Sequence, residues 1–180
     1  MSGAGARKGG VSGRHPWRRL AAWIIDCLCA LGWAAVTAAV GVPLLLAGVI
    51  RPSGLVLLNV IGAVVVVVPV TVGLAVLESR TGATWGKRAL GLRVEAPGGT
   101  LSFGRALARN ALKVALPWLI GHAAVFAVVT SPSSAGAVVL LLLAYVLPVT
   151  WIVTLFVPPG RTPYDRIAGD VVVRAGVGRR

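Results

Sequence analysis

Acidic residues are scarce in this sequence: five of its 180 residues are Asp or Glu, against 18 Lys or Arg. Charged residues make up 13% of the chain and hydrophobic residues 57%, whereas a soluble domain usually carries about twice that charge. The chain therefore has too little polar surface for a water-soluble fold. Few carboxylates also leave little for acid–base catalysis, and the sequence contains no Ser/His/Asp grouping, metal-ligand cluster or phosphate-binding loop. We expect neither an enzyme nor a bound cofactor or metal.

Cysteine is almost absent as well. The two that occur, Cys27 and Cys29, lie two residues apart inside an apolar run. On a helix that spacing points them to different faces, and it matches neither a metal-ligand nor a redox motif. We interpret both as small apolar side chains that face helices or lipid.

Long apolar runs dominate what is present. About 20 apolar residues suffice to cross the hydrocarbon core of a bilayer, and four runs reach that length: 20–50, 55–77, 112–130 and 137–157. Backbone groups must be paired internally in lipid, so these runs predict helices. The expected fold is an all-α integral membrane protein with four transmembrane helices, at about 20–45, 55–77, 112–130 and 137–157. We expect kinks at the prolines inside the spans, which are Pro69, Pro117 and Pro148.

Basic residues gather in three blocks that flank the spans. Seventeen of the 18 lie on one side of the predicted membrane, and Arg51 alone falls on the other. The positive-inside rule therefore places both termini in the cytoplasm. The expected organisation is a disordered basic tail (1–15), a membrane domain (16–175) and a short basic tail (176–180). A cleaved signal peptide is the rival interpretation of the first run, but Asp26 interrupts its apolar core.

The net charge of +13 could also suggest nucleic-acid binding. However, the basic blocks border apolar runs and leave no folded soluble module that could present a basic groove. We expect the lipid bilayer and its anionic headgroups as partners, and no nucleic acid.

The segment 78–111, between the second and third spans, is too patterned for a plain loop. Residues 92–101 alternate on either side of a Pro-Gly-Gly turn, which predicts a short cytoplasmic β-hairpin. The β-branched run 170–174 is expected to pair with this hairpin as a small sheet against the membrane.

An amphipathic helix should follow the hairpin. Ser102 is a suitable N-cap for a helix that continues into the third span. Arg105, Arg109 and Lys113 lie four residues apart and form one basic stripe on it. This stripe could face anionic lipid or a buried carboxylate.

Asp26 is a carboxylate inside the first span. It lies six residues past Leu20, about 9 Å along a helix, where an unpaired carboxylate costs at least ~2.5 kcal/mol. It therefore needs a proton, a cation or a basic partner. Arg19 lies two turns earlier on the same face, and the candidates from other segments are Arg105, Arg109 and Lys113. Asp26 is either a lock between helices or a cation- or proton-binding site.

His122 is a secondary candidate, about midway along the third span. Imidazole titrates near neutral pH and could relay protons. We interpret this histidine instead as neutral and hydrogen-bonded to a neighbouring helix.

Three motifs follow one another along residues 15–175: 18–26 (RRLAAWIID), 85–94 (WGKRALGLRV) with 102–110 (SFGRALARN) close behind, and 164–173 (YDRIAGDVVV). Together they resemble RDD family membrane proteins, a family named for one arginine and two aspartates. The resemblance makes Arg18 or Arg19 the family arginine, and Asp26 and Asp165 the aspartates. Trp85 stands where the family commonly has proline, and Asp170 where it usually has threonine.

The resemblance implies a multi-pass protein of the bacterial inner membrane with a role in transport, and cation/proton exchange is suggested for some members. One hypothesis is a small transporter, working as a homodimer, in which Asp26 and Asp165 bind a cation or proton and are balanced by Arg18 or Arg19 and by Arg109. The other is a non-transporting scaffold whose basic cytoplasmic face binds anionic lipid or a protein partner.

Overall fold

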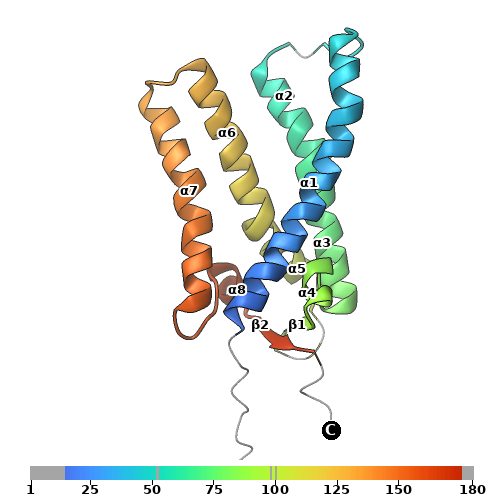
Figure 1. The fold of residues 1–180 in the computed structure, drawn as a ribbon, viewed down its shortest axis with the longest axis vertical. Helices are drawn as coiled ribbons and strands as arrows, with labels where there is room; N and C mark the ends of the chain where they lie inside the picture. Colours follow the sequence, from blue (N-terminus) through green and yellow to red (C-terminus); the bar gives the residue numbers. More distant parts are fainter. Residues whose placement is uncertain (1–14, 52, 98, 100, 176–180) are drawn as a thin grey trace, which may run out of the picture.

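The computed structural model describes residues 15–51, 53–97, 99 and 101–175 (Figure 1). The predicted tails therefore lie outside the described residues, apart from His15. The elements follow one another as α1 (Pro16–Leu46), α2 (Leu55–Gly62), the π-helical turn η1 (Ala63–Val67), α3 (Val68–Thr81), α4 (Trp85–Ala89), β1 (Leu92–Glu95), α5 (Phe103–Asn110), the π-helical turn η2 (Ala111–Ala115), α6 (Leu116–Thr130), α7 (Ala135–Phe156), α8 (Pro163–Ala168) and β2 (Val171–Arg174).

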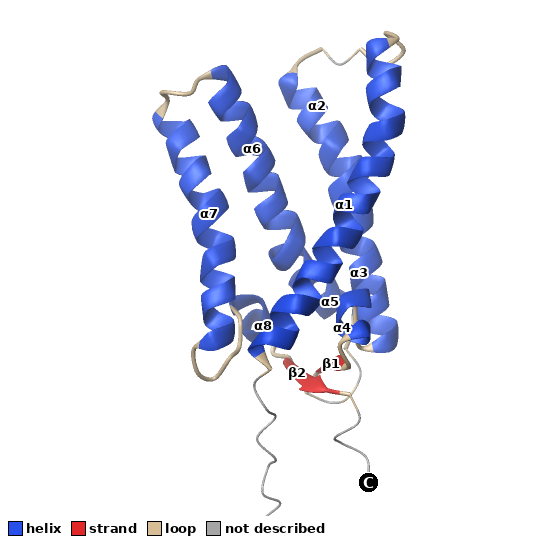
Figure 2. Ribbon diagram, in the orientation of Figure 1, coloured by secondary structure: helices blue, strands red, loops and turns tan. Residues whose placement is uncertain are grey.

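Four continuous helical stretches are long and apolar enough to cross a membrane, which confirms the predicted number: Pro16–Leu46, Val56–Thr81, Phe103–Thr130 and Ala135–Phe156. The short helices α4 and α8 and both strands lie at one end of this bundle, which we call the charged end (Figures 1 and 2). The second and third stretches run past their apolar residues into this end. There α3 stops at Gly82, whose φ of 73° is the left-handed conformation that ends many helices.

The third stretch begins nine residues before its apolar run. Ser102 caps it, since its hydroxyl accepts a hydrogen bond from the backbone N–H of Arg105 at 3.4 Å. The predicted amphipathic helix therefore exists as α5, and it continues through η2 into α6 without a break.

Two prolines, Pro69 and Pro117, lie just beyond the two π-helical turns. Pro69 comes two residues after η1, and Pro117 two residues after η2. A proline has no N–H and leaves the carbonyl four residues earlier without its helical partner. For Pro69 that carbonyl belongs to Val65, and the indole N–H of Trp33 on α1 donates to it at 3.0 Å. The neighbouring helix thus satisfies the group that the proline frees.

The two strands form an antiparallel pair at the charged end, with Leu92 opposite Arg174 and Glu95 opposite Val171. The tail run therefore pairs with the 92–95 segment as predicted. Among the described residues of 92–101, the second strand of the expected hairpin does not form, and a single bridge joins Ala96 to Gly99. Val94 faces inward and packs with α3 and α5 in a small apolar core, and the tail strand occupies the open edge of β1.

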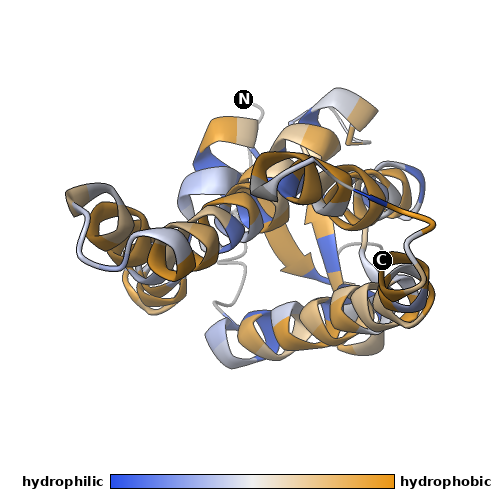
Figure 3. Cartoon of the chain, turned by 90° about the horizontal axis from the view of Figure 1, so that it is seen from above, coloured by the Kyte–Doolittle hydropathy of each residue, from blue (hydrophilic) through white to orange (hydrophobic). Residues whose placement is uncertain are grey.

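Burial in this fold is concentrated toward the charged end. The buried residues of α1 are Ala22, Asp26 and Ala30, all in its first half. In Figure 1 the pair α6 and α7 leans away from the pair α1 and α2 toward the opposite end of the molecule. Apolar residues make up most of the helical ribbon when the bundle is viewed from above (Figure 3). Most of that apolar surface is outward-facing, as expected where lipid is the solvent.

Candidate functional site

A cluster of eight charged side chains lies inside the charged end. Four are carboxylates, drawn from the chain's five acidic residues, and four are cations, so their formal charges cancel. Seven are buried, and Arg19 is partly exposed. We call them the charge cluster: Arg19, Asp26, Glu78, Lys87, Arg109, Lys113, Asp165 and Asp170. Charges this deeply buried are stable only when they are paired and hydrogen-bonded.

Asp26 of α1 is held by three donors. The ammonium of Lys113 on η2 lies 3.0 Å from its Oδ2, the Thr84 hydroxyl donates to the same oxygen at 2.8 Å, and the backbone N–H of Gly86 donates to Oδ1 at 2.9 Å. The last contact requires glycine, because a Cβ at position 86 would lie 2.0 Å from the carbonyl oxygen of Ala22. Helix α4 therefore sits directly on α1, and Lys113 is the partner of Asp26 that the sequence left open.

Glu78, near the end of α3, is the second buried carboxylate. It forms an ion pair with Lys87 of α4, and Arg109 of α5 brings its Nε to 3.4 Å from Oε2. The Asn110 amide donates to the same oxygen at 2.9 Å. Burial lowers the pKa of Lys87 to about 8 even though Glu78 opposes that change. The Glu78 carboxylate therefore joins α3, α4 and α5 at the charged end.

Asp165 of α8 joins the beginning of α1 to α5. Arg19 forms an ion pair with its Oδ2 and also donates to the Gly160 carbonyl, while Nη1 of Arg109 lies 2.9 Å from Oδ1. The same carboxylate accepts a hydrogen bond from the Thr162 backbone N–H at 3.2 Å. The Thr162 hydroxyl in turn accepts one from the Asp165 backbone N–H, and the two bonds form a capping box. Burial alone would raise the pKa of Asp165, but Arg109 and Arg19 lower it below the ordinary value.

Asp170, between α8 and β2, completes the cluster. Its Oδ2 lies 3.6 Å from Nη1 of Arg109, and neither carboxylate oxygen has a hydrogen-bond partner within the described part of the chain. The residue is fully buried. Burial raises the pKa of Asp170, and the nearby Arg109 and Arg105 only partly offset this effect. Arg109 thus pairs with three carboxylates, those of Glu78, Asp165 and Asp170. Its guanidinium also lies 5.8 Å from the centroid of the Tyr164 ring.

The structure brings together five of the residues predicted from the sequence: Arg19, Asp26, Arg109, Lys113 and Asp165. It leaves three outside the cluster. Arg18 is exposed and reaches the Leu90 carbonyl at 3.4 Å, and Arg105 is exposed on α5. His122 lies farther along α6, stacked on Trp118 with their ring centroids 5.8 Å apart. Of the two candidates for the family arginine, Arg19 is the one paired with an aspartate.

The sequence pattern does not indicate five residues of the site: Glu78, Thr84, Lys87, Asn110 and Asp170. The apolar run ends before Glu78, so the sequence predicts this residue only as the start of the connecting segment 78–111. A signal was nevertheless present, since an acidic residue is rare in this chain and Glu78 directly follows a span. The tail pattern predicts Asp170 as part of the strand 170–174, whereas the structure places it just before β2.

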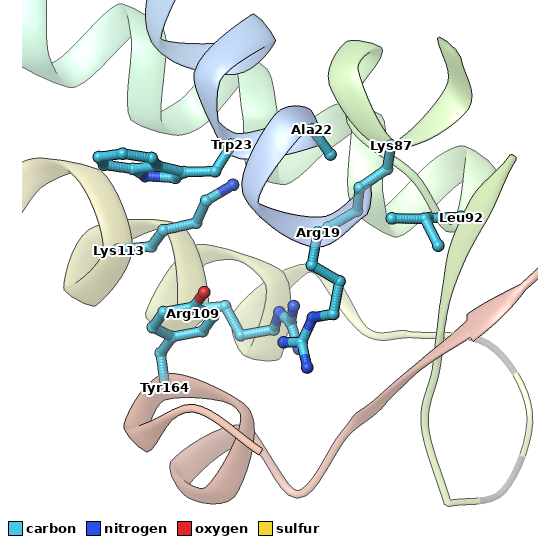
Figure 4. A pocket seen from close by; sticks show the side chains of 8 residues that line it. All are labelled: Arg19, Ala22, Trp23, Lys87, Leu92, Arg109, Lys113 and Tyr164. Carbon is cyan, nitrogen blue, oxygen red and sulfur yellow. The ribbon is translucent and has the colours of Figure 1, made fainter. Parts of the chain in front are cut away.

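Two cavities adjoin the cluster. One is a groove of about 600 Å³ between α1 and the η1–α3 stretch, lined mainly by apolar groups that include Trp33, Gly73 and Trp85, and Asp26 lies on its wall. The other is a small space of about 20 Å³ inside the cluster (Figure 4). Asp26 therefore stands between the apolar groove and the charged interior.

Among the described residues, no group of three or more His, Cys, Asp or Glu side chains could hold a metal ion. In comparisons with known proteins, the sequence model of the RDD family matches residues 14–169. No curated protein and no solved structure matches the chain.

Proposed function

This chain belongs to the RDD family of membrane proteins, and from that premise we propose that it is a transporter of a small monovalent cation or a proton rather than an enzyme. The observation that carries the proposal is the position of Asp26. Its carboxylate lies on the wall of the groove between α1 and α3 and is at the same time paired with Lys113. A transported ion that enters the groove would meet this carboxylate first.

Competition for Asp26 supplies the mechanism. A bare carboxylate at this depth costs at least ~2.5 kcal/mol, so Asp26 always needs a positive partner. When a cation or proton binds Asp26, the ammonium of Lys113 is displaced, and when that ion leaves, the ion pair at 3.0 Å forms again. Thr84 and Gly86 keep the carboxylate in place during the exchange because they donate to it from a separate element.

Asp165 holds in place the elements around the exchanging pair of Asp26 and Lys113. It is held by Arg19, by Arg109 and by its own capping box, and its pKa is lowered. It is therefore ionised throughout the cycle. We assign it a positioning role: it fixes α5, from which the helix continues to Lys113.

We place the charged end in the cytoplasm of a bacterial cell, with the bundle in the inner membrane. The support is the positive-inside rule, together with exposed arginines at that end: Arg18, Arg80, Arg88, Arg93, Arg105, Arg166 and Arg174. Four helices are few for alternating access, so a homodimer is the proposed working unit.

Flux across proteoliposomes under Na⁺, K⁺ and pH gradients tests this function. Asp26→Asn removes the exchangeable charge and should abolish gradient-driven flux while the protein still inserts. Glu95→Gln is the matched control, since Glu95 is an exposed acidic residue on β1 outside the cluster, and its flux should equal that of the wild type. Unchanged flux in a folded Asp26→Asn protein would remove Asp26 from the mechanism.

The exposed arginines also favour a second function, a scaffold that binds anionic lipid or a partner protein. Trp17 and Trp85 are exposed at the same end, where indoles suit the headgroup region. In that case Arg105→Ala combined with Arg166→Ala should weaken binding to vesicles with anionic lipid, while no ion flux is seen in the wild type. Measured wild-type flux would decide in favour of transport.

A further inference from the structure

The small cavity inside the charge cluster has an unusual lining. Four cationic side chains line it, from α1, α4, α5 and η2, whereas none of the four cluster carboxylates does. Its lining residues are Arg19, Ala22, Trp23, Lys87, Leu92, Arg109, Lys113 and Tyr164 (Figure 4).

The cations around this space have hydrogen-bond donors to spare. An ammonium has three donors, and Lys113 and Lys87 each make one side-chain hydrogen bond within the described residues. Nε and Nη1 of Arg109 are ion-paired with Glu78 and Asp165, but neither contact is a well-directed hydrogen bond, and the side chain is 2% exposed. Tyr164 is the one lining side chain that can also accept.

An acceptor-only occupant fits this lining better than water. A buried water needs acceptors for its two hydrogens as well as donors for its oxygen. The rest of the lining is largely apolar, and its charged side chains supply only donors. An anion accepts from every side. The volume of about 20 Å³ is enough for one water-sized particle, so phosphate and sulfate are excluded by size.

We infer that this cavity binds one small monovalent anion of the halide class, such as chloride. The site shares Lys113 with the proposed exchange at Asp26, but the binding of the anion requires no ion flux. Its failure and the failure of the transport proposal can therefore be distinguished, since anion binding is measured on the purified protein without a gradient.

Charge balance couples this anion to a proton. The cluster is neutral without the anion, so a bound halide needs a compensating positive charge. Asp170 can supply it by taking a proton from water, because its carboxylate is fully buried and lacks hydrogen bonds in the described structure. The groups that act on it are Arg109, Arg105, Asp165 and Glu78, and burial raises its pKa. Halide binding should therefore strengthen as pH falls.

Thermal unfolding of the purified protein in detergent tests the site. Chloride is exchanged for gluconate at constant ionic strength, which separates binding from screening. At about ten times its Kd, chloride should raise Tm by about 3–6 °C, saturably and more at pH 5.5 than at pH 7, a range in which Lys87, whose pKa is about 8, stays protonated. Sulfate should not reproduce the rise. If chloride and gluconate give the same Tm, the cavity holds water and the inference is wrong.

Two variant pairs locate the effect. Leu92→Phe fills the cavity and should abolish the chloride response, whereas Val94→Leu enlarges a buried residue on the same strand that does not line it and should retain the response. Asp170→Asn should make chloride binding independent of pH, and Glu95→Gln should leave the pH dependence intact. If Leu92→Phe does not fold, Asp170→Asn still decides: an unaltered pH dependence in this variant would overturn the coupling to Asp170.

Discussion

The two ends of this bundle are stabilised by different means. At the charged end, six elements meet around paired carboxylates and cations that are almost entirely buried. Toward the opposite end, the helices carry apolar side chains with few buried neighbours: between 6% and 22% of the most apolar window of each span is buried. The first half of α1 contains all its buried residues, and its second half contains none.

This difference follows from the solvent. Lipid is as apolar as leucine, so apolar helices gain little by leaving lipid for one another. Polar groups lose far more if they remain unpaired in hydrocarbon. The charge cluster therefore specifies how three of the four spans meet, since α7 contributes no residue to it, and the apolar surface specifies only that the spans lie in a membrane.

The largest effect on stability is expected when Arg109, the central cation of the charge cluster, is replaced. Arg109→Met leaves Glu78, Asp165 and Asp170 short of a partner, and breaking a buried ion pair costs about 3–5 kcal/mol. The free energy of unfolding in mixed micelles measures the loss. Arg105→Met, one turn earlier on the exposed face of α5, should change it by less than about 0.5 kcal/mol. Equal losses in both variants would show that the cluster does not hold the fold.

A glycine substitution should give the next largest effect. In Gly86→Ala the new Cβ would lie 2.0 Å from the Ala22 carbonyl oxygen, so α4 must move off α1 and release its N–H from Asp26. Overpacking of this kind costs about 1–3 kcal/mol, measured by the same unfolding assay. Gly121→Ala in α6 is the control, because its Cβ would meet nothing within 4 Å, and it should be neutral or slightly stabilising. A tolerated Gly86→Ala would mean that α4 is not docked as described.

Within the apolar region, the smallest effect is expected at Trp33. Trp33→Phe keeps an aromatic ring but removes the donor to the Val65 carbonyl, a loss of about 0.5–1.5 kcal/mol in the free energy of unfolding. Trp17→Phe is the matched control: Trp17 is exposed and packs edge-on against Phe156, 4.9 Å between ring centroids. If both variants lose the same stability, the hydrogen bond contributes nothing beyond the ring.

The apolar region was the easier part to predict. Length and hydropathy alone determine the four spans, because any run of this composition must be helical in lipid. The expected end of the first span near 45 and the helical continuation upstream of the third span both hold, as α1 and α5 show. The π-helical turns were not predicted, since their position depends on how Trp33 and other neighbours meet the backbone.

The charged end was predicted only in part. Asp26, Arg109 and Lys113 stand out because charge inside or beside a span is rare. Their pairing could not be derived, since Asp26 and Lys113 are 87 residues apart and four basic residues were candidates for the same carboxylate. The partner strand of 92–95 was anticipated in the tail, but a hairpin was also expected because a local turn is the shorter route to a second strand. The tail strand formed that pair instead.

Asp165 also constrains the order in which the molecule can mature during synthesis. Ribosomes produce Arg19 and Arg109 well before this aspartate, so Arg19 lacks its carboxylate partner until α8 emerges and folds back, whereas Arg109 already has Glu78. The capping box then couples the folding of this six-residue helix to the arrival of its two arginines. A nascent chain stalled before Asp165 would insert its spans but leave them loosely associated, with cations available to chaperones or quality-control proteases.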